Sequence, residues 1–148
     1  MAEAAPIVVL LVEDNPADVR MIREALAVTR APHELHVVED GEQALDFLAR
    51  RGAHEGAPRP DVMLLDLNIP KIPGHEVLRC IRNDRSFPRF PVVVLTGSRL
   101  EQDIEESFAC NATEHIVKPT RLYEYVGEIA FALGLVRRLA AAPRPGAA

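Results

Sequence analysis

Residues 62–66 read VMLLD, four apolar side chains followed by the carboxylate of Asp66. A run this short, with no polar alternation, predicts a strand that is buried on both faces of a sheet. Three further apolar runs end in polar residues: Ile7–Val12 before Glu13-Asp14, Val92–Leu95 before Thr96, and Ile116–Val117 before Lys118. The C-terminal ends of parallel strands meet at one edge of a sheet, where open α/β sheets bind ligands. The polar residues are therefore expected to gather at that edge.

The segments between these strands carry apolar residues at helical spacing. Asn15 followed by Pro16 predicts a helix start, and Asp40 three residues before Gln43 predicts another. A fifth strand is expected at Leu35–Val38. Five strands that alternate with five helices predict the α/β class, as a three-layer, doubly wound (βα)5 sandwich of the flavodoxin type with a parallel sheet of order 2-1-3-4-5. The switch point of that order lies between the first and third strands, which end in Glu13-Asp14 and Asp66.

Composition narrows the class of protein. The 148 residues are 48% hydrophobic and 26% charged, and their net charge is −5. A negative charge without a basic cluster argues against nucleic acid as a direct partner. The absence of a signal peptide and of an apolar run of about 18 residues predicts a cytoplasmic protein that does not contact the membrane. Cys80 and Cys110 lack a CxxC spacing and are expected to be buried, reduced thiols.

One domain is expected to account for most of the chain. We place its boundaries at residues 6–139, after an N-terminal tail at 1–5. Residues 140–148 are rich in Ala, Pro and Gly and predict a disordered tail, too short for an output domain.

Three carboxylates in one small pocket require either that their pKa values rise or that a cation lies among them. Each pair about 4 Å apart repels by roughly 1 kcal/mol in water and roughly 4 kcal/mol at an effective dielectric constant of 20. Hard oxygen ligands with room for water suit Mg²⁺. Lys118 adds a positive charge and Thr96 a hydroxyl donor, both suited to an anion. The set indicates phosphoryl transfer, with an aspartate carboxylate able to act as the nucleophile.

Four segments resemble the receiver domain of two-component response regulators across roughly residues 6–137: VVLLVEDNPAD (8–18), LLDLNIP (64–70), VVVLTGS (92–98) and IVKP (116–119). The resemblance implies that Asp66 accepts a phosphoryl group from a histidine kinase phosphohistidine. It further implies a Mg²⁺ ion bound directly by the side chains of Asp14 and Asp66 and the backbone carbonyl of Asn68, with Glu13 acting through water.

The resemblance also assigns the groups that contact the phosphoryl group. Thr96 and Lys118 would contact it, Gly97 would leave access to it, and a cis peptide bond would precede Pro119. Such a domain is a signalling phosphoacceptor and not an enzyme in the usual sense, since it catalyses only its own phosphorylation and dephosphorylation.

One position departs from the family pattern. The family usually has Tyr or Phe three residues before the lysine, where this chain has His115. That aromatic residue carries the signal to the face formed by the fourth helix, fifth strand and fifth helix. An imidazole there puts the usual switch in question, because it is polar and its charge depends on pH.

The resemblance also names partners. They would be a sensor histidine kinase or a phosphotransfer protein. The stretches NPADVR, RGAHEGAPRPD and LDLNIPK resemble short regulators paired with phytochrome-type kinases, which makes a bacteriophytochrome a candidate partner. Several such relatives dimerise through the face of the fourth helix, fifth strand and fifth helix, so a homodimer is expected.

Three alternatives compete with this interpretation. A Mg²⁺-dependent aspartyl-nucleophile phosphatase would need a second Asp two residues after the first, where this chain has Asn68, which cannot donate the proton. A flavodoxin-like FMN carrier would need a first loop that binds phosphate, which Glu13-Asp14 would repel. A receiver used only for docking, without phosphorylation, would not need the complete acidic pocket.

Overall fold

A computed structural model describes residues 5–87, 89–97 and 112–141. In this part of the chain five strands form one sheet in the order β2-β1-β3-β4-β5. Every neighbouring pair is parallel, which confirms the predicted strand order. The strands have these bounds: β1 (Ile7–Val12), β2 (His33–Val38), β3 (Val62–Asp66), β4 (Val92–Thr96) and β5 (Glu114–Val117).

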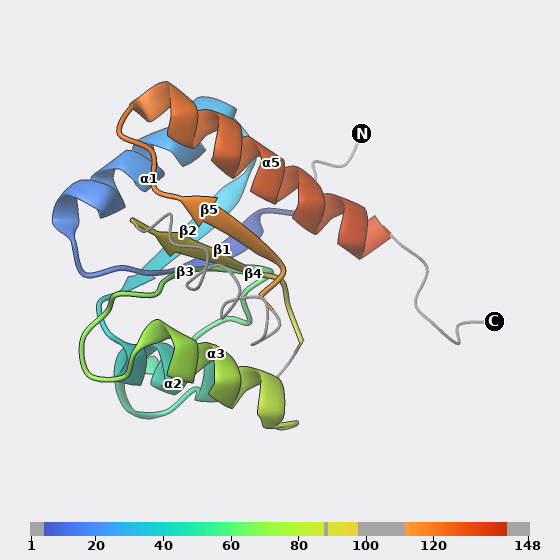
Figure 1. Cartoon of the computed structure of the whole chain (residues 1–148). Helices are drawn as coiled ribbons and strands as arrows, with labels where there is room; N and C mark the ends of the chain where they lie inside the picture. Colours follow the sequence, from blue (N-terminus) through green and yellow to red (C-terminus); the bar gives the residue numbers. More distant parts are fainter. Residues whose placement is uncertain (1–4, 88, 98–111, 142–148) are drawn as a thin grey trace.

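Helices cover both faces of the sheet, as a doubly wound sandwich requires. Figure 1 shows α1 and α5 over one face and α2 and α3 over the other. The helices have these bounds: α1 (Pro16–Thr29), α2 (Gly41–Ala49), the 3₁₀ turn η1 (Gly52–His54), α3 (Gly74–Asn83) and α5 (Leu122–Ala141). The helix expected near residues 98–109 lies outside the described residues. For the described residues, the predicted arrangement of one sheet between two layers of helices is confirmed.

The core is split by the sheet, and β1 contributes to both halves. Val9 and Leu11 pack with α1 and α5, whereas Leu10 and Val12 pack with α2 and α3. All five residues of β3 are buried. A fully buried Leu or Val contributes about 1.5–3 kcal/mol, so the positions of the central strands are strongly fixed. Val12 pairs with Leu65, and this register brings the polar end of β1 beside the end of β3.

Side-chain caps begin the first two helices as predicted. Asn15 Oδ1 accepts a hydrogen bond of 2.9 Å from the backbone N–H of Ala17, and Pro16 occupies the first helical position. Asp40 Oδ1 accepts one of 2.7 Å from the backbone N–H of Gln43. The first cap matters for function, because it fixes the direction in which α1 leaves the end of β1.

The last helix continues past the residue at which we place the end of the domain. Helix α5 ends at Ala141, two residues beyond the expected boundary at 139. Alanine is the best helix former, so Ala140 and Ala141 extend the helix although their composition suggested a tail. The predicted tails at residues 1–4 and 142–148 lie outside the described residues.

One expectation about the surface is wrong. Cys80 is a free thiol that is exposed and not buried. The reason is its place on α3, whose core side is formed by Val77, Leu78 and Ile81. In the described ranges, none of the helices combines the length and the apolarity that crossing a bilayer requires.

Candidate functional site

Three carboxylates meet at the C-terminal ends of β1 and β3. Glu13 and Asp66 are almost fully buried, at 1% and 3% exposure, whereas Asp14 is exposed. One oxygen from each carboxylate lies within 4.8 Å of the others. The two strands are neighbours in the sheet but not in the sequence, so this is the switch point that the strand order predicts.

Lys118 brings a positive charge to these carboxylates from the end of β5. Its backbone N–H donates a 2.7 Å hydrogen bond to the Thr96 carbonyl, which fixes the chain beside β4. The ammonium Nζ lies 2.8 Å from Glu13 Oε2 and 2.9 Å from Asp66 Oδ2. It also lies 2.8 Å from Asp18 Oδ2, on the first turn of α1. One ammonium therefore joins three carboxylates from three elements.

The pKa values of the site reflect both burial and pairing. Burial raises the pKa of the Glu13 carboxyl from 4.5 to about 7, although its contact with Lys118 works in the opposite direction. Asp66 adds to the rise because it is a neighbouring negative charge. Burial alone would lower the pKa of Lys118, but its bonds to Asp18, Glu13 and Asp66 raise it above the ordinary 10.5. The ammonium thus stays charged, while Glu13 can be neutral at physiological pH.

Asp18 is the site residue that the sequence did not reveal. An acidic residue in the first turn of a helix is ordinarily explained by the helix dipole. Asp18 instead accepts a hydrogen bond from Lys118, 100 positions away in the chain. The Asn15 cap orients this turn of α1 toward the ends of the strands. A capped helix that starts directly after an acidic pair is the only signal in the sequence that could have suggested this role.

The turn after Asp66 holds the carboxylate in place. The backbone N–H of Asn68 donates a 2.9 Å hydrogen bond to Asp66 Oδ1. Oδ2 is bonded to Lys118, so both oxygens of Asp66 have fixed directions. The N–H of Gly74, at the start of α3, then donates to the Leu67 carbonyl at 3.1 Å. The carbonyl of Asn68 remains a predicted metal ligand.

Gly74 allows α3 to approach this turn closely. A Cβ at Gly74 would lie 2.6 Å from Leu67 Cα and 2.8 Å from the Asp66 carbonyl oxygen. Gly74→Ala must therefore displace backbone next to Asp66, and we expect it to lower the free energy of unfolding by about 1–3 kcal/mol. Gly127→Ala in α5 is the control, since a Cβ there meets nothing within 4 Å. It should raise stability by about 0.5–1 kcal/mol. Urea unfolding measures both, and equal effects would contradict the role of Gly74.

The remaining predicted positions lie on β4, β5 and the turns that follow them. Thr96 ends β4 and is 7% exposed, next to Lys118 through the backbone hydrogen bond. Gly97 follows it, is exposed, and has open space where a side chain would lie. His115 is half-buried in β5, paired in register with Val94, two residues before Thr96. The strand order places Thr96 and Lys118 at the same edge as Asp66; the contacts of their side chains with a phosphoryl group stay predictions.

The peptide bond before Pro119 corrects one prediction. It is trans, like every other peptide bond in the described ranges. The trans form of an X–Pro bond is favoured by about 0.5–1 kcal/mol. The trans chain already lets Lys118 reach Glu13, Asp18 and Asp66, so these contacts do not require the cis form.

The donor set fits the hard divalent cation that the sequence suggests. Carboxylate oxygens of Glu13, Asp14 and Asp66 converge, and these are the ligands that Mg²⁺ prefers. The exposure of Asp14 leaves one side open to water, which suits an ion that keeps several water ligands. The ammonium of Lys118 contacts the other two carboxylates, those of Glu13 and Asp66. The side chains present therefore fit Mg²⁺ bound beside Asp66.

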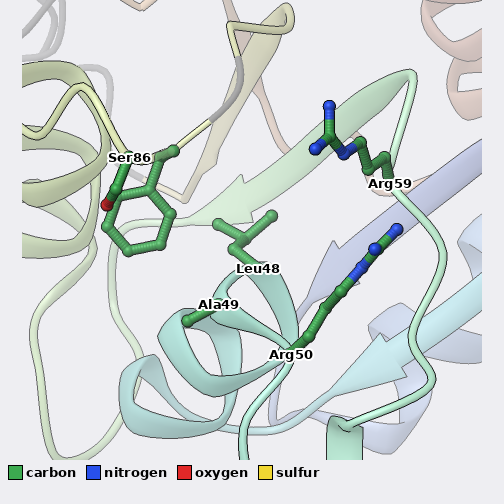
Figure 2. A pocket seen from close by; sticks show the side chains of 6 residues that line it. Leu48, Ala49, Arg50, Arg59 and Ser86 are labelled. Atoms are coloured by element: carbon green, nitrogen blue, oxygen red, sulfur yellow. The ribbon is translucent and has the colours of Figure 1, made fainter.

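Two surface hollows in the described part of the chain lie apart from these carboxylates. One of them, of about 240 Å³, lies between the end of α2 and Ser86. Figure 2 shows these residues, with Arg50 and Arg59 at the other side of the hollow. The second, of about 500 Å³, is lined by residues of α2, α3 and the turn after α3. Neither of these two hollows is lined by a predicted site residue.

Comparison with known proteins identifies similar sequences. Residues 9–130 match the family described as the response regulator receiver domain. The response regulator Rcp1 of Synechocystis is 43% identical over 117 residues, which are 79% of this chain and 80% of Rcp1.

Two solved structures resemble the whole fold. The phosphorylated cyanobacterial phytochrome response regulator RcpA has a TM-score of 0.83 and 40% identity, over 96% of this chain and 100% of RcpA. The Mn²⁺-bound form of Rcp1 has a TM-score of 0.81 and 37% identity, over 95% of this chain and 100% of that structure. The likeness thus extends to a phosphorylated relative and to a metal-bound one.

Proposed function

Because the chain belongs to the receiver domain family of response regulators, we propose that it accepts a phosphoryl group on Asp66 from the phosphohistidine of a sensor histidine kinase. The observation that carries this proposal is the position of Asp66. It is buried at the switch point, beside two further carboxylates and 2.9 Å from the Lys118 ammonium. A carboxylate oxygen of Asp66 attacks phosphorus, and the P–O bond forms as the P–N bond to histidine breaks. The product is an acyl phosphate.

Each neighbouring group has a defined part in this reaction. Asp14, Asp66 and the Asn68 carbonyl would hold Mg²⁺, and Glu13 would support it through water. When bound, Mg²⁺ neutralises charge on the phosphoryl oxygens. Lys118 neutralises the same oxygens from the other side, and the Thr96 hydroxyl donates a hydrogen bond to them. The closeness of Lys118 to Asp66 in the structure supports its role.

We further propose that the partner kinase is of the phytochrome type. The support is the likeness to RcpA, which is described as a phytochrome response regulator, over 96% of this chain. Dimerisation through the face that contains β5 and α5, and a switch at His115 in place of the usual aromatic residue, also remain proposals. Transfer to a phosphotransfer protein is compatible with the same chemistry at Asp66.

Family membership removes support from the phosphatase alternative. Such a phosphatase needs a second acid two residues after the nucleophile, and this chain has Asn68 at that position. The backbone N–H of Asn68 donates a hydrogen bond to the Asp66 carboxylate. The carboxylates around Asp66 also argue against a receiver used only for docking, which would not need the acidic pocket.

The proposal predicts Mg²⁺-dependent labelling. Incubation with acetyl phosphate should add one phosphoryl group in the presence of Mg²⁺, because the metal offsets the repulsion between the phosphoryl oxygens and the carboxylates. Intact-mass spectrometry measures the addition, and chelation with EDTA should abolish it. Equal labelling with and without Mg²⁺ would contradict the proposed site.

A further inference from the structure

The hollow drawn in Figure 2 carries positive charge, although the chain as a whole is acidic. Its 6 lining residues are these: Leu48, Ala49, Arg50, Arg59, Ser86 and Phe87. None of them is acidic, whereas the net charge of the chain is −5. Among the residues that the structure describes, no carboxylate forms an ion pair with Arg50 or Arg59, although the neighbouring Arg51 pairs with Asp46 at 3.3 Å. Two guanidinium groups without a carboxylate partner on one small hollow favour an anion as its occupant.

The backbone holds both arginines in defined positions. Arg50 ends α2 in the left-handed conformation, with φ 56° and ψ 47°. Arg59 lies between two prolines, whose rings fix the backbone on either side of it. In the view of Figure 2 both arginine side chains lie on one side of Leu48, and Ser86 lies on the other. The positive side of the hollow is therefore formed by the fold itself.

The other half of the hollow is apolar and suits a ring. Leu48 belongs to the core between the sheet and the α2 and α3 layer, and the half-buried Phe87 packs against that core. The turn that carries Phe87 is ordered, since Asp84 Oδ1 accepts a 2.9 Å hydrogen bond from the backbone N–H of Ser86. Pockets for drug-sized ligands measure about 300–1,000 Å³. The volume here, about 240 Å³, indicates a compound of about one ring.

We propose that this hollow binds an aromatic phosphate monoester, a small compound in which one phosphate group is attached to a ring. Such a phosphate carries a charge of about −1.5 to −2 at pH 7, which matches the two guanidinium groups of Arg50 and Arg59. Guanidinium groups bind phosphate oxygens through paired N–H donors. The ring lies over Leu48 and contacts the ring of Phe87.

The proposed site is separate from the carboxylate cluster. Arg59 precedes β3 and Asp66 ends that strand, so the hollow and the proposed phosphoacceptor lie at opposite edges of the sheet. Binding in the hollow requires neither a metal ion nor phosphorylation. The inference therefore goes beyond the proposed function, and either one can fail without the other.

Titration with phenyl phosphate in the presence of EDTA, followed by ¹H–¹⁵N NMR, tests the site. The amide signals of Leu48, Arg59 and Ser86 should shift, with a Kd on the order of 1 mM for so small a ligand. Inorganic phosphate lacks the ring and should bind about 5-fold more weakly. Equal affinity for inorganic phosphate, or shifts confined to residues around Asp66, would overturn the proposal.

Arg50→Gly separates binding from folding. Glycine adopts the left-handed conformation without steric cost, so the urea midpoint of unfolding should not fall. The Kd for phenyl phosphate should rise about 10-fold, because one charge-assisted contact is lost. Arg30→Gly is the matched control, since Arg30 ends α1 at φ 57° and does not line the hollow. Binding should be unchanged in this control. An equal loss in both variants, or undiminished binding in Arg50→Gly, would overturn the site.

A peptide that contains phosphotyrosine presents the same chemical group on a protein chain. Its affinity should equal that of phenyl phosphate, because a hollow of about 240 Å³ holds the ring and its phosphate and little else. Much tighter binding of the peptide would show that contacts outside the hollow contribute. That result would overturn the assignment to a small compound and place the ligand on a protein partner.

Discussion

Asp66→Asn is expected to reduce phosphoryl labelling to background. Asparagine has nearly the same shape and keeps an oxygen that can accept from the Asn68 N–H, so the turn should persist. The amide is not a nucleophile, and loss of a nucleophile lowers a rate by on the order of 10³-fold or more. Autoradiography after transfer from a labelled histidine kinase, or intact mass after acetyl phosphate, measures the loss. The fold should survive, as unfolding curves would show.

Asp61→Asn provides a matched control on the same strand. Asp61 immediately precedes β3, and Asp66 ends it, so the two carboxylates lie at opposite ends of one strand. Asp61 accepts a 2.8 Å hydrogen bond from the backbone N–H of Val8, which an asparagine oxygen can also accept. Labelling should be unchanged in this variant. Phosphoryl groups that persist in the Asp66→Asn protein, or disappear in the Asp61→Asn protein, would assign the chemistry to another residue.

The fold could be predicted because its central strands carry a simple signal. β3 and β4 are buried on both faces, so every position is apolar up to the final polar residue. That pattern predicts where the strand lies in the sequence, that its neighbours in the sheet are parallel, and at which residue it ends. The end of α5 was less predictable, because Ala140 and Ala141 are compatible with both a helix and a tail. Helix ends depend on small differences in propensity that composition alone does not separate.

The candidate site was predictable only in the part that follows from strand order. Glu13 and Asp66 meet because their strands are neighbours, which the switch-point rule states in advance. The contact of Asp18 with Lys118 depends instead on how α1 leaves its cap and packs on the sheet. No local pattern encodes that approach. The trans form of the bond before Pro119 is likewise not encoded by the local sequence. The two isomers differ by about 1 kcal/mol, so the surrounding structure decides between them.

Lys118→Met is expected to destabilise the protein by about 3–5 kcal/mol at pH 8. Methionine keeps much of the volume of the side chain and removes its charge. Glu13, Asp18 and Asp66 then lose the cation that lies within 2.9 Å of each. Breaking a buried ion pair leaves charge in a poorly solvated place, which is the origin of the large cost. Urea unfolding of the metal-free protein measures it.

The destabilisation should depend on pH, and Glu13 sets the direction. Its pKa is raised from 4.5 to about 7 in the folded protein, so the stability that this group contributes is fully present below pH 4.5 and is lost as the pH rises through about 7. That loss is about 3 kcal/mol for Glu13 alone. Lys118 lowers the pKa of Glu13, so its removal raises that pKa further. The gap in stability between the two proteins should therefore widen from pH 5 to pH 8, as Glu13 ionises beside Asp66.

Lys71→Met separates this effect from the loss of any lysine. Lys71 also has two carboxylate neighbours, Asp40 at 3.6 Å and Glu42 at 3.7 Å, but its side chain is 57% exposed. Exposed ion pairs contribute about 0–1 kcal/mol, so this variant should differ little from the unmutated protein at either pH. A cost at Lys118 that is equally small, or that does not grow between pH 5 and pH 8, would mean that water already solvates the three carboxylates. The buried position of Glu13, at 1% exposure, argues for the larger cost.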